Sequence, residues 1–124
     1  MRVILTTDKK NSLSFLGKRQ SSDIEVYRYI ASHFQPLCMN AYAQAGMTKS
    51  LGEEIAVQED AQDMFLEGDF DMALLDNASG LVVFNWNRDY PHDRVLDLSG
   101  WKKISEEKFK GHSHDKVTVT EYVR

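Results

Sequence analysis

Apolar and polar residues follow the clearest pattern near the two ends of the chain. Residues 2–7 form a short apolar run that predicts a buried first strand. Along 116–123, valines alternate with threonines and a tyrosine, as expected for a half-buried strand. The apolar run 81–88 predicts a further strand, and 94–98 and 101–105 predict two more extended segments. These segments predict a sheet that includes the C-terminus.

A helix is predicted after two loops, 8–12 and 13–20. Ser22 and Glu25 have the spacing of a capping box, in which the hydroxyl and the carboxylate each bind a free amide of the first helical turn. Apolar residues then repeat every three to four positions as far as Phe34, and the helix ends before the following proline. The second loop is long for a simple connection, which indicates that it lines a site.

The middle of the chain has a less regular pattern. The apolar run 37–42 has the length of a strand, and 70–75 predicts another one. Between them, 59–67 predicts a short helix that ends at Gly68, because glycine is favoured just after a helix. The segment 43–52 contains two glycines and mixed polarity. Both a loop and a frayed helix remain open for it.

Strands that alternate with helices favour parallel crossover connections. The order of elements therefore predicts an α/β fold with three layers: a mixed, mostly parallel sheet, flanking helices and a C-terminal antiparallel strand pair. The 124 residues fit one domain, 1–124, since single cores commonly have about 100 to 150 residues.

The composition narrows the classes of function. Fifteen lysines and arginines against 19 acidic residues give a net charge of −4, and the cations are scattered, so we expect no nucleic-acid binding. No stretch approaches the roughly 20 apolar residues of a membrane span, and the N-terminus lacks the apolar core of a signal peptide. With one cysteine, no internal disulfide is expected, which favours the cytoplasm. The sequence predicts no oligomeric state.

A metal site is one candidate for chemistry. His112, His114 and Asp115 are similar to the start of the H-x-H-x-D-H motif of metallo-β-lactamase-type hydrolases. The last histidine of that motif is replaced by Lys116. A catalytic zinc normally has three protein ligands, so a polar turn before the last strand is the favoured interpretation.

Other reactive groups have simpler explanations. Cys38 lies in an apolar run and is expected in the core. Ser21 and Ser22 lack the glycines of a nucleophile elbow, so no catalytic triad is predicted. No glycine-rich phosphate loop is present, and we expect no cofactor. The acidic residues between 53 and 71 predict a solvated face, with a docking surface for a basic partner as the alternative.

Asp23 is the carboxylate with the most suggestive position. It lies at the start of the predicted first helix, where that helix faces the ends of the strands, and α/β sheets bind ligands there. A carboxylate in the first turn is also stabilised by the helix dipole without any function. From position alone, the structural interpretation is preferred.

The residues around Asp23 resemble the dihydrofolate reductase fold. That family has L-P-x-D/E-[LM]-x-x-F at the start of its first helix, where the acid interacts with the pterin; here Asp23, Ile24 and Tyr27 stand at the matching positions. The order of the C-terminal strands, with the Asp93 turn and Trp101 between them, also fits. The resemblance implies a ligand site formed by Asp23, Tyr27, Phe15 and Arg94.

The departures from the family argue against its chemistry. The glycine and arginine of the M-G-R-x-T-W-E-S segment are missing at 39–42, and 75–78 lacks the Gly-Gly pair that lets the dinucleotide approach. Asp76 would also repel a pyrophosphate. Arg94 replaces the threonine that binds the catalytic acid, which predicts an ion pair between Arg94 and Asp23.

The leading hypothesis is a small protein with a shortened dihydrofolate-reductase-like fold that binds a small molecule or a protein without catalysis. Three alternatives remain open. The first is a residual reductase with a nucleotide or flavin cofactor. The second is a metal-dependent hydrolase or nuclease that uses His112 and His114. The third is an acidic inhibitor or immunity-type partner of a basic protein.

Overall fold

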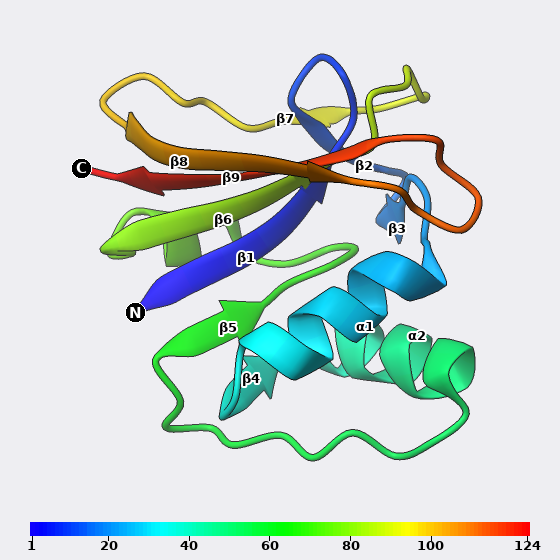
Figure 1. The fold of residues 1–124 in the computed structure, drawn as a ribbon. Helices are drawn as coiled ribbons and strands as arrows, with labels where there is room; N and C mark the ends of the chain where they lie inside the picture. Colours follow the sequence, from blue (N-terminus) through cyan, green and yellow to red (C-terminus); the bar gives the residue numbers. More distant parts are fainter.

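The main sheet has six strands, and β1 lies near its centre (Figure 1). The structure, a computed structural model, describes residues 1–124. Across the sheet, the strands are β4 (Leu37–Met39), β5 (Asp63–Phe65), β1 (Arg2–Thr7), β6 (Gly80–Asn85), β9 (Val117–Val123) and β8 (Lys102–Phe109). The first four run parallel, while β9 pairs antiparallel with both β6 and β8. This arrangement places β8 at one open edge of the sheet.

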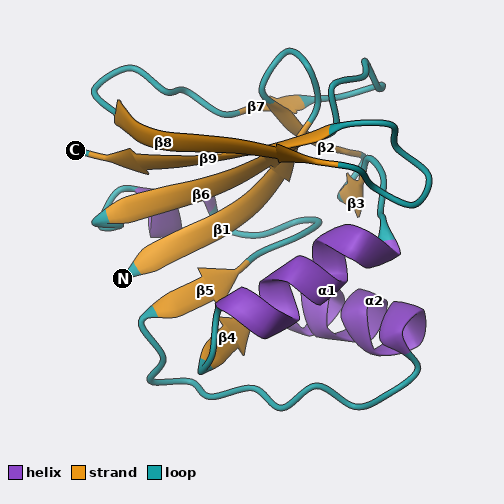
Figure 2. Cartoon of the chain, viewed as in Figure 1, coloured by secondary structure: helices purple, strands orange, loops and turns teal.

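Two helices, α1 (Ile24–His33) and α2 (Ala41–Leu51), cover one face of the sheet (Figure 2). Val26 and Ile30 of α1 are fully buried, and they share a core cluster with Ile4 of β1 and Met47 of α2. Burial of each such aliphatic side chain stabilises the fold by about 1.5 to 3 kcal/mol. The periodic apolar positions of the first helix therefore fix it on the sheet.

The opposite face of the sheet carries a second apolar cluster, which includes Val3, Leu5 and Leu81. A small three-stranded sheet covers this face together with the 3-10 helix η1 (Met72–Leu75). The strands of the small sheet are β3 (Lys18–Arg19), β2 (Ser12–Phe15) and β7 (Arg94–Val95). The predicted α/β class, the mixed and mostly parallel sheet and the C-terminal antiparallel pair are confirmed.

Two predicted elements are wrong. The helix expected over 59–67 is strand β5, because Met64 and Phe65 pair in register with β1 on one side and β4 on the other. The strand expected over 70–75 contains η1 instead, with the Asp71 carboxylate accepting a hydrogen bond from the Ala73 amide. Pairing with neighbouring strands determines the conformation of β5, and capping by Asp71 determines that of η1.

The structure also refines the helix ends. Asp23, rather than Ser22, caps α1, since its side chain accepts a hydrogen bond from the amide of Glu25. Residues 43–51 belong to α2, and Gly52 follows the helix as its C-cap in a left-handed conformation with φ of 71°. The predicted strand 37–42 ends at Met39, because Asn40 caps α2.

The remaining segments differ from the prediction mainly in length. The loop 13–20 forms the hairpin of β2 and β3, while 94–98 keeps only the two-residue strand β7. The segment predicted over 101–105 extends to Phe109 as β8, and its side chains are largely exposed. Neither helix has the length and apolar character that crossing a membrane requires.

Candidate functional site

The turn between β8 and β9 is fastened to the start of α1 by Asp23. The Asp23 side chain is fully buried and accepts hydrogen bonds from the amides of His112, Ser113 and His114, at 2.9, 2.9 and 3.2 Å. It also accepts hydrogen bonds from the Ser113 hydroxyl and from the Glu25 amide. Gly111 lies so close to this carboxylate that a Cβ at its position would contact Oδ2 at 2.6 Å. The chain itself therefore saturates the Asp23 carboxylate.

The environment keeps Asp23 ionised. Burial alone would raise the pKa of Asp23, but the His112 amide, the His114 ring and the Ser113 amide together outweigh burial. The pKa of this carboxyl is consequently well below its usual value. Its role as a ligand-binding residue stays a prediction, while its position as a helix cap is observed.

His114 connects Asp23 to two hydroxyl groups. Its Nδ1 lies 2.9 Å from Oδ2 of Asp23, so Nδ1 carries the proton and donates to the carboxylate. The buried ring stacks on Trp86, with 4.5 Å between the ring centroids. Its Nε2 lies 3.0 Å from the hydroxyl of Ser21 and 3.0 Å from that of Tyr90. When the ring proton is on Nδ1, Nε2 offers one lone pair, which can accept from one of these two hydroxyls at a time.

The structure gives Ser21 a contact that the sequence did not predict. Its hydroxyl, the His114 ring and the Asp23 carboxylate form a continuous chain of hydrogen bonds. Sequence spacing could not reveal it, because Ser21 and His114 are 93 residues apart and no glycine elbow surrounds the serine.

His112 and Asp115, the other candidate metal ligands, are exposed on the same turn. No group of three histidine, cysteine or acidic side chains in residues 1–124 has a spacing that could hold a metal ion. His114 already uses both ring nitrogens in hydrogen bonds.

The predicted ion pair between Arg94 and Asp23 is wrong. The Arg94 guanidinium donates to the carbonyl oxygens of Gly68, at 3.1 Å, and of Phe70. It also lies over the Phe70 ring, 4.6 Å from the centroid. Arg94 therefore fixes the loop after β5, and the Asp23 carboxylate is occupied by the turn 112–114 instead.

Tyr27 belongs to a buried polar cluster that the sequence did not indicate. Its hydroxyl donates to Glu67 at 3.0 Å, and Nε of Arg19 lies 3.2 Å from the other Glu67 oxygen. The Arg19 guanidinium stacks on the Tyr42 ring at 4.1 Å and donates to the Tyr42 carbonyl. Burial raises the pKa of Glu67, although Arg19 opposes this effect. Arg19 therefore connects the β2–β3 hairpin to Tyr42 of α2 and to Glu67, which follows β5.

Phe15 lies at the tip of the same hairpin. It is 41% exposed and lines an open cavity of about 280 Å³. The cavity is lined by Phe15, Leu16, Lys18, Arg19, Gln20 and Pro91. Of the four predicted ligand-binding residues, only Phe15 lines a cavity. The four residues therefore do not share a common cavity.

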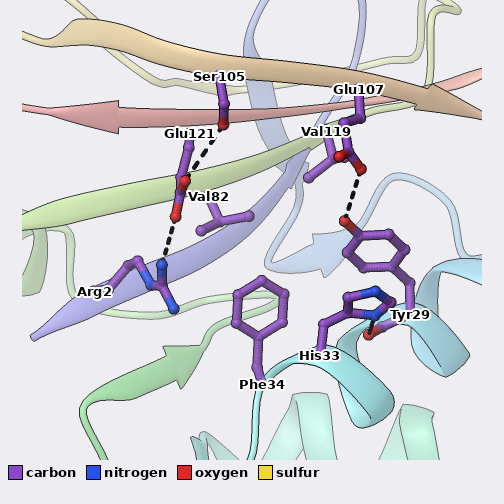
Figure 3. Close-up of a pocket in the computed structure, with 9 residues that line it drawn as sticks. All are labelled: Arg2, Tyr29, His33, Phe34, Val82, Ser105, Glu107, Val119 and Glu121. Carbon is purple, nitrogen blue, oxygen red and sulfur yellow. Dashed lines mark hydrogen bonds and ion pairs between the residues drawn. The ribbon is translucent and has the colours of Figure 1, made fainter.

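A second cavity opens between α1 and the antiparallel half of the main sheet (Figure 3). We call it the α1–sheet cleft; its volume is about 290 Å³. It is lined by Arg2, Tyr29, His33, Phe34, Val82, Ser105, Glu107, Val119 and Glu121. Figure 3 shows the aromatic side chains of α1 on one side and two glutamates of the sheet on the other.

The polar groups of the α1–sheet cleft form two separate arrangements. Glu121 accepts hydrogen bonds from Arg2 and from the Ser105 hydroxyl, and Arg2 also pairs with Asp63. Glu107 accepts only one hydrogen bond, from the Tyr29 hydroxyl at 3.3 Å. Glu107 therefore retains free acceptor capacity at the edge of the cleft.

Neither glutamate was predicted to line a site, because the strand predicted over 101–105 ends before Glu107. Continuing the alternation of that strand would have placed Ser105 and Glu107 on one face. Glu121 is part of the last predicted strand, where it pairs with Ser105 of β8. The alternation of side chains along this strand was therefore the sequence pattern that could have indicated the cleft residues of β8.

The acid-rich segment 53–71 does not form one solvated surface. Most of its carboxylates are exposed, but Glu67 is buried and Asp63 pairs with Arg2. Cys38 is buried as expected, and burial raises the pKa of its thiol. The thiol is therefore a core group rather than a nucleophile.

Comparison with known proteins identifies the fold. No protein-family model and no curated protein matches the chain. Among solved structures, the chain is similar to dihydrofolate reductase from Enterococcus faecalis, determined in complex with NADP(H) and RAB-propyl. The TM-score is 0.63 at 11% identity, and the alignment covers 99% of this chain and 95% of that one. This likeness confirms the dihydrofolate-reductase-like fold and concerns the fold alone.

Proposed function

We propose that this protein binds a small organic cation in the α1–sheet cleft, without reductase chemistry. The observation that carries the proposal is the pair of glutamates, Glu107 and Glu121, opposite an aromatic wall. Small-molecule sites combine apolar walls with a few polar groups that orient the ligand, which is the composition of this cleft.

Charge favours a cation over an anion. Two glutamates, Glu107 and Glu121, line the cleft together with a single guanidinium, that of Arg2. The guanidinium is held by Asp63 and Glu121, so Glu107 is the carboxylate left to pair with a ligand. A ligand ammonium beside Glu107 would gain a charge-assisted hydrogen bond.

The walls favour a ligand with a flat apolar body. Tyr29 stacks on His33 with 3.9 Å between centroids, and Phe34 and the two valines contribute apolar surface. Aromatic rings pack on such surfaces in offset or edge-to-face geometry. The volume of about 290 Å³ suits one ring system with a short amine chain rather than a dinucleotide.

Three ligands that differ mainly in charge test the proposal: tryptamine, the neutral alcohol tryptophol, and indole-3-acetate. We expect tryptamine to bind in calorimetric titration and to raise the heat-denaturation midpoint, and the acid to do neither. NADPH, flavin and folate added to the same assay are expected to leave the midpoint unchanged. Equal binding of all three indoles would contradict a role for the glutamates.

A matched pair of variants locates the ligand. Glu107→Gln removes the free carboxylate from the cleft, whereas Glu106→Gln changes the neighbouring residue, which pairs with Lys103. We expect Glu107→Gln to weaken tryptamine binding about tenfold, since a charge-assisted hydrogen bond contributes about 1.5 kcal/mol. Glu106→Gln should bind like the unaltered protein. A similar loss in both variants would indicate general charge rather than this site.

A further inference from the structure

We propose that Ser21 is the nucleophile of an acyl-transfer site, with His114 as general base and Asp23 as the residue that orients the imidazole. The chain of contacts is direct: Ser21 Oγ to His114 Nε2 is 3.0 Å, and His114 Nδ1 to Asp23 Oδ2 is 2.9 Å. Both distances lie within the range of about 2.6 to 3.2 Å that defines a nucleophile and its base.

The burial of the three groups matches their roles. Asp23 and His114 are 3% and 2% exposed, which shields their hydrogen bond from water. Ser21, the proposed nucleophile, is only partly buried. The Asp23 carboxylate also accepts hydrogen bonds from the His114 amide and the Ser113 hydroxyl. These contacts fix the carboxylate, which in turn orients the His114 ring.

A donor for a developing oxyanion lies near the serine. The amide of Asp23, two residues after Ser21, donates no hydrogen bond within the protein. A free backbone amide of this kind stabilises the negative charge that develops on the carbonyl oxygen during acyl transfer.

The adjacent cavity indicates the substrate class. Gln20 and Pro91, the chain neighbours of Ser21 and Tyr90, both line the cavity beside Phe15 at the tip of the β2–β3 hairpin, and the Gln20 side-chain amide donates to the Pro91 carbonyl at 3.4 Å. Phe15 and Leu16 give this cavity exposed apolar surface. A cavity of about 280 Å³ that combines Phe15 and Leu16 with polar side chains suits a small carboxylic ester with a short acyl chain.

The reaction balances with water as the only co-reactant. Ser21 Oγ attacks the ester carbonyl as its proton passes to His114 Nε2, and the tetrahedral oxyanion collapses with cleavage of the bond to the alcohol oxygen. His114 then returns the proton to the leaving alkoxide. Water attacks the acyl-serine with its proton taken by Nε2, and that proton goes back to Ser21 as the carboxylic acid leaves.

This activity is independent of the α1–sheet cleft. Ser21 precedes the start of α1, whereas the cleft residues His33 and Phe34 lie at its opposite end, and a helix of ten residues is about 15 Å long at 1.5 Å per residue. Loss of tryptamine binding in Glu107→Gln is therefore expected to leave esterase activity unchanged.

Two neighbouring serines supply the test. The protein is treated with a fluorophosphonate probe and assayed with p-nitrophenyl acetate, alongside Ser21→Ala and Ser22→Ala. We expect the probe to label Ser21, as located by peptide mass spectrometry, and Ser21→Ala to lose labelling and at least about tenfold in hydrolysis rate. Ser22 is exposed and outside the hydrogen-bond chain, so Ser22→Ala should keep both. Labelling elsewhere, no labelling, or equal rates in the two variants would overturn the proposal.

Cysteine variants give a second readout that a purely structural serine would not affect. In Ser21→Cys, the imidazole is expected to convert the thiol to thiolate below its ordinary pKa of about 8.5. Alkylation by iodoacetamide at pH 6.5 should then be about tenfold faster than in Ser22→Cys. Equal alkylation rates with the same pH dependence would show that His114 does not activate position 21.

Discussion

Nδ1 of His114 donates a hydrogen bond of 2.9 Å to Oδ2 of Asp23, although 91 residues separate the two side chains in the sequence. The contact joins the last hairpin of the sheet to the start of the first helix. One carboxylate therefore serves the helix cap, the β8–β9 turn and the orientation of an imidazole. Changes at Asp23 should affect both stability and reactivity.

We expect Asp23→Asn to destabilise the protein by about 3 kcal/mol. The new NH2 group would replace one of the two acceptor oxygens, so it would face either the amide of His112, which binds Oδ1, or the amides of Ser113 and His114, which bind Oδ2. Asp115→Asn, an exposed change in the same turn, should cost less than about 0.5 kcal/mol. Urea unfolding measures both. Equal effects would contradict the role of Asp23 as the anchor of the turn.

The contribution of Asp23 should depend on pH in a defined direction. Its folded pKa is depressed, while the unfolded carboxyl titrates near its ordinary value of about 3.9. The unfolded chain therefore takes up the proton first as the pH falls. The stabilisation is fully present above about pH 5 and is lost progressively as the pH falls toward the folded pKa.

The difference in unfolding free energy between the unaltered protein and Asp23→Asn measures the pH-dependent contribution of the Asp23 carboxylate to stability. It should be largest between pH 5 and 7 and shrink on going to pH 4 and pH 3. Because both proteins keep Glu67, the opposite pKa shift of that residue cancels in the difference. If the difference in unfolding free energy grew as the pH fell, the folded pKa of Asp23 would not be depressed.

Arg19 and Glu67 should show strong energetic coupling. Arg19→Ala leaves the buried Glu67 carboxylate without its cation, and Glu67→Gln leaves the guanidinium without its anion. We expect the double variant to be more stable than the two single losses predict, by about 1 to 3 kcal/mol. Lys18→Ala, an exposed neighbour, should show no coupling with Glu67→Gln. Additive effects would mean that the pair does not act as a unit.

Gly46 gives a prediction in which the sign of the effect changes. Alanine within a helix is normally more stable than glycine by about 1 kcal/mol. At position 46 of α2, however, a Cβ would overlap the Arg19 guanidinium. We expect Gly46→Ala to destabilise the unaltered protein but to stabilise Arg19→Ala by about 0.5 to 1 kcal/mol. Stabilisation in both backgrounds would show that Gly46 makes no room for Arg19.

The long periodic segments of the fold could be predicted from the sequence, whereas its short elements could not. The helix ending near Phe34 and the strands at 2–7 and 117–123 carry enough repeated apolar positions to define their type. Strand β5 has only three residues, and its pairing with β1 and β4 determines its conformation. The cap formed by Asp71 was the local signal that could have identified η1.

The candidate site was predicted only in part, because its contacts join distant residues. The position of Asp23 at the helix start followed from the sequence, but its partners in the turn 112–114 did not. Arg94 was predicted to form an ion pair with Asp23, because sequence register alone cannot show that the Arg94 guanidinium binds backbone carbonyl oxygens instead. Glu67 was counted as a surface acid, because its partner Tyr27 lies 40 residues away.

A tryptamine titration followed in amide NMR spectra of the full chain would show whether the α1–sheet cleft binds a cation. We expect saturable shifts at Tyr29, His33, Val82, Glu107 and Val119, with the turn 112–114 unaffected, and loss of these shifts in Glu107→Gln. Shifts confined to the hairpin 13–20, or no saturable shift at all, would contradict this expectation.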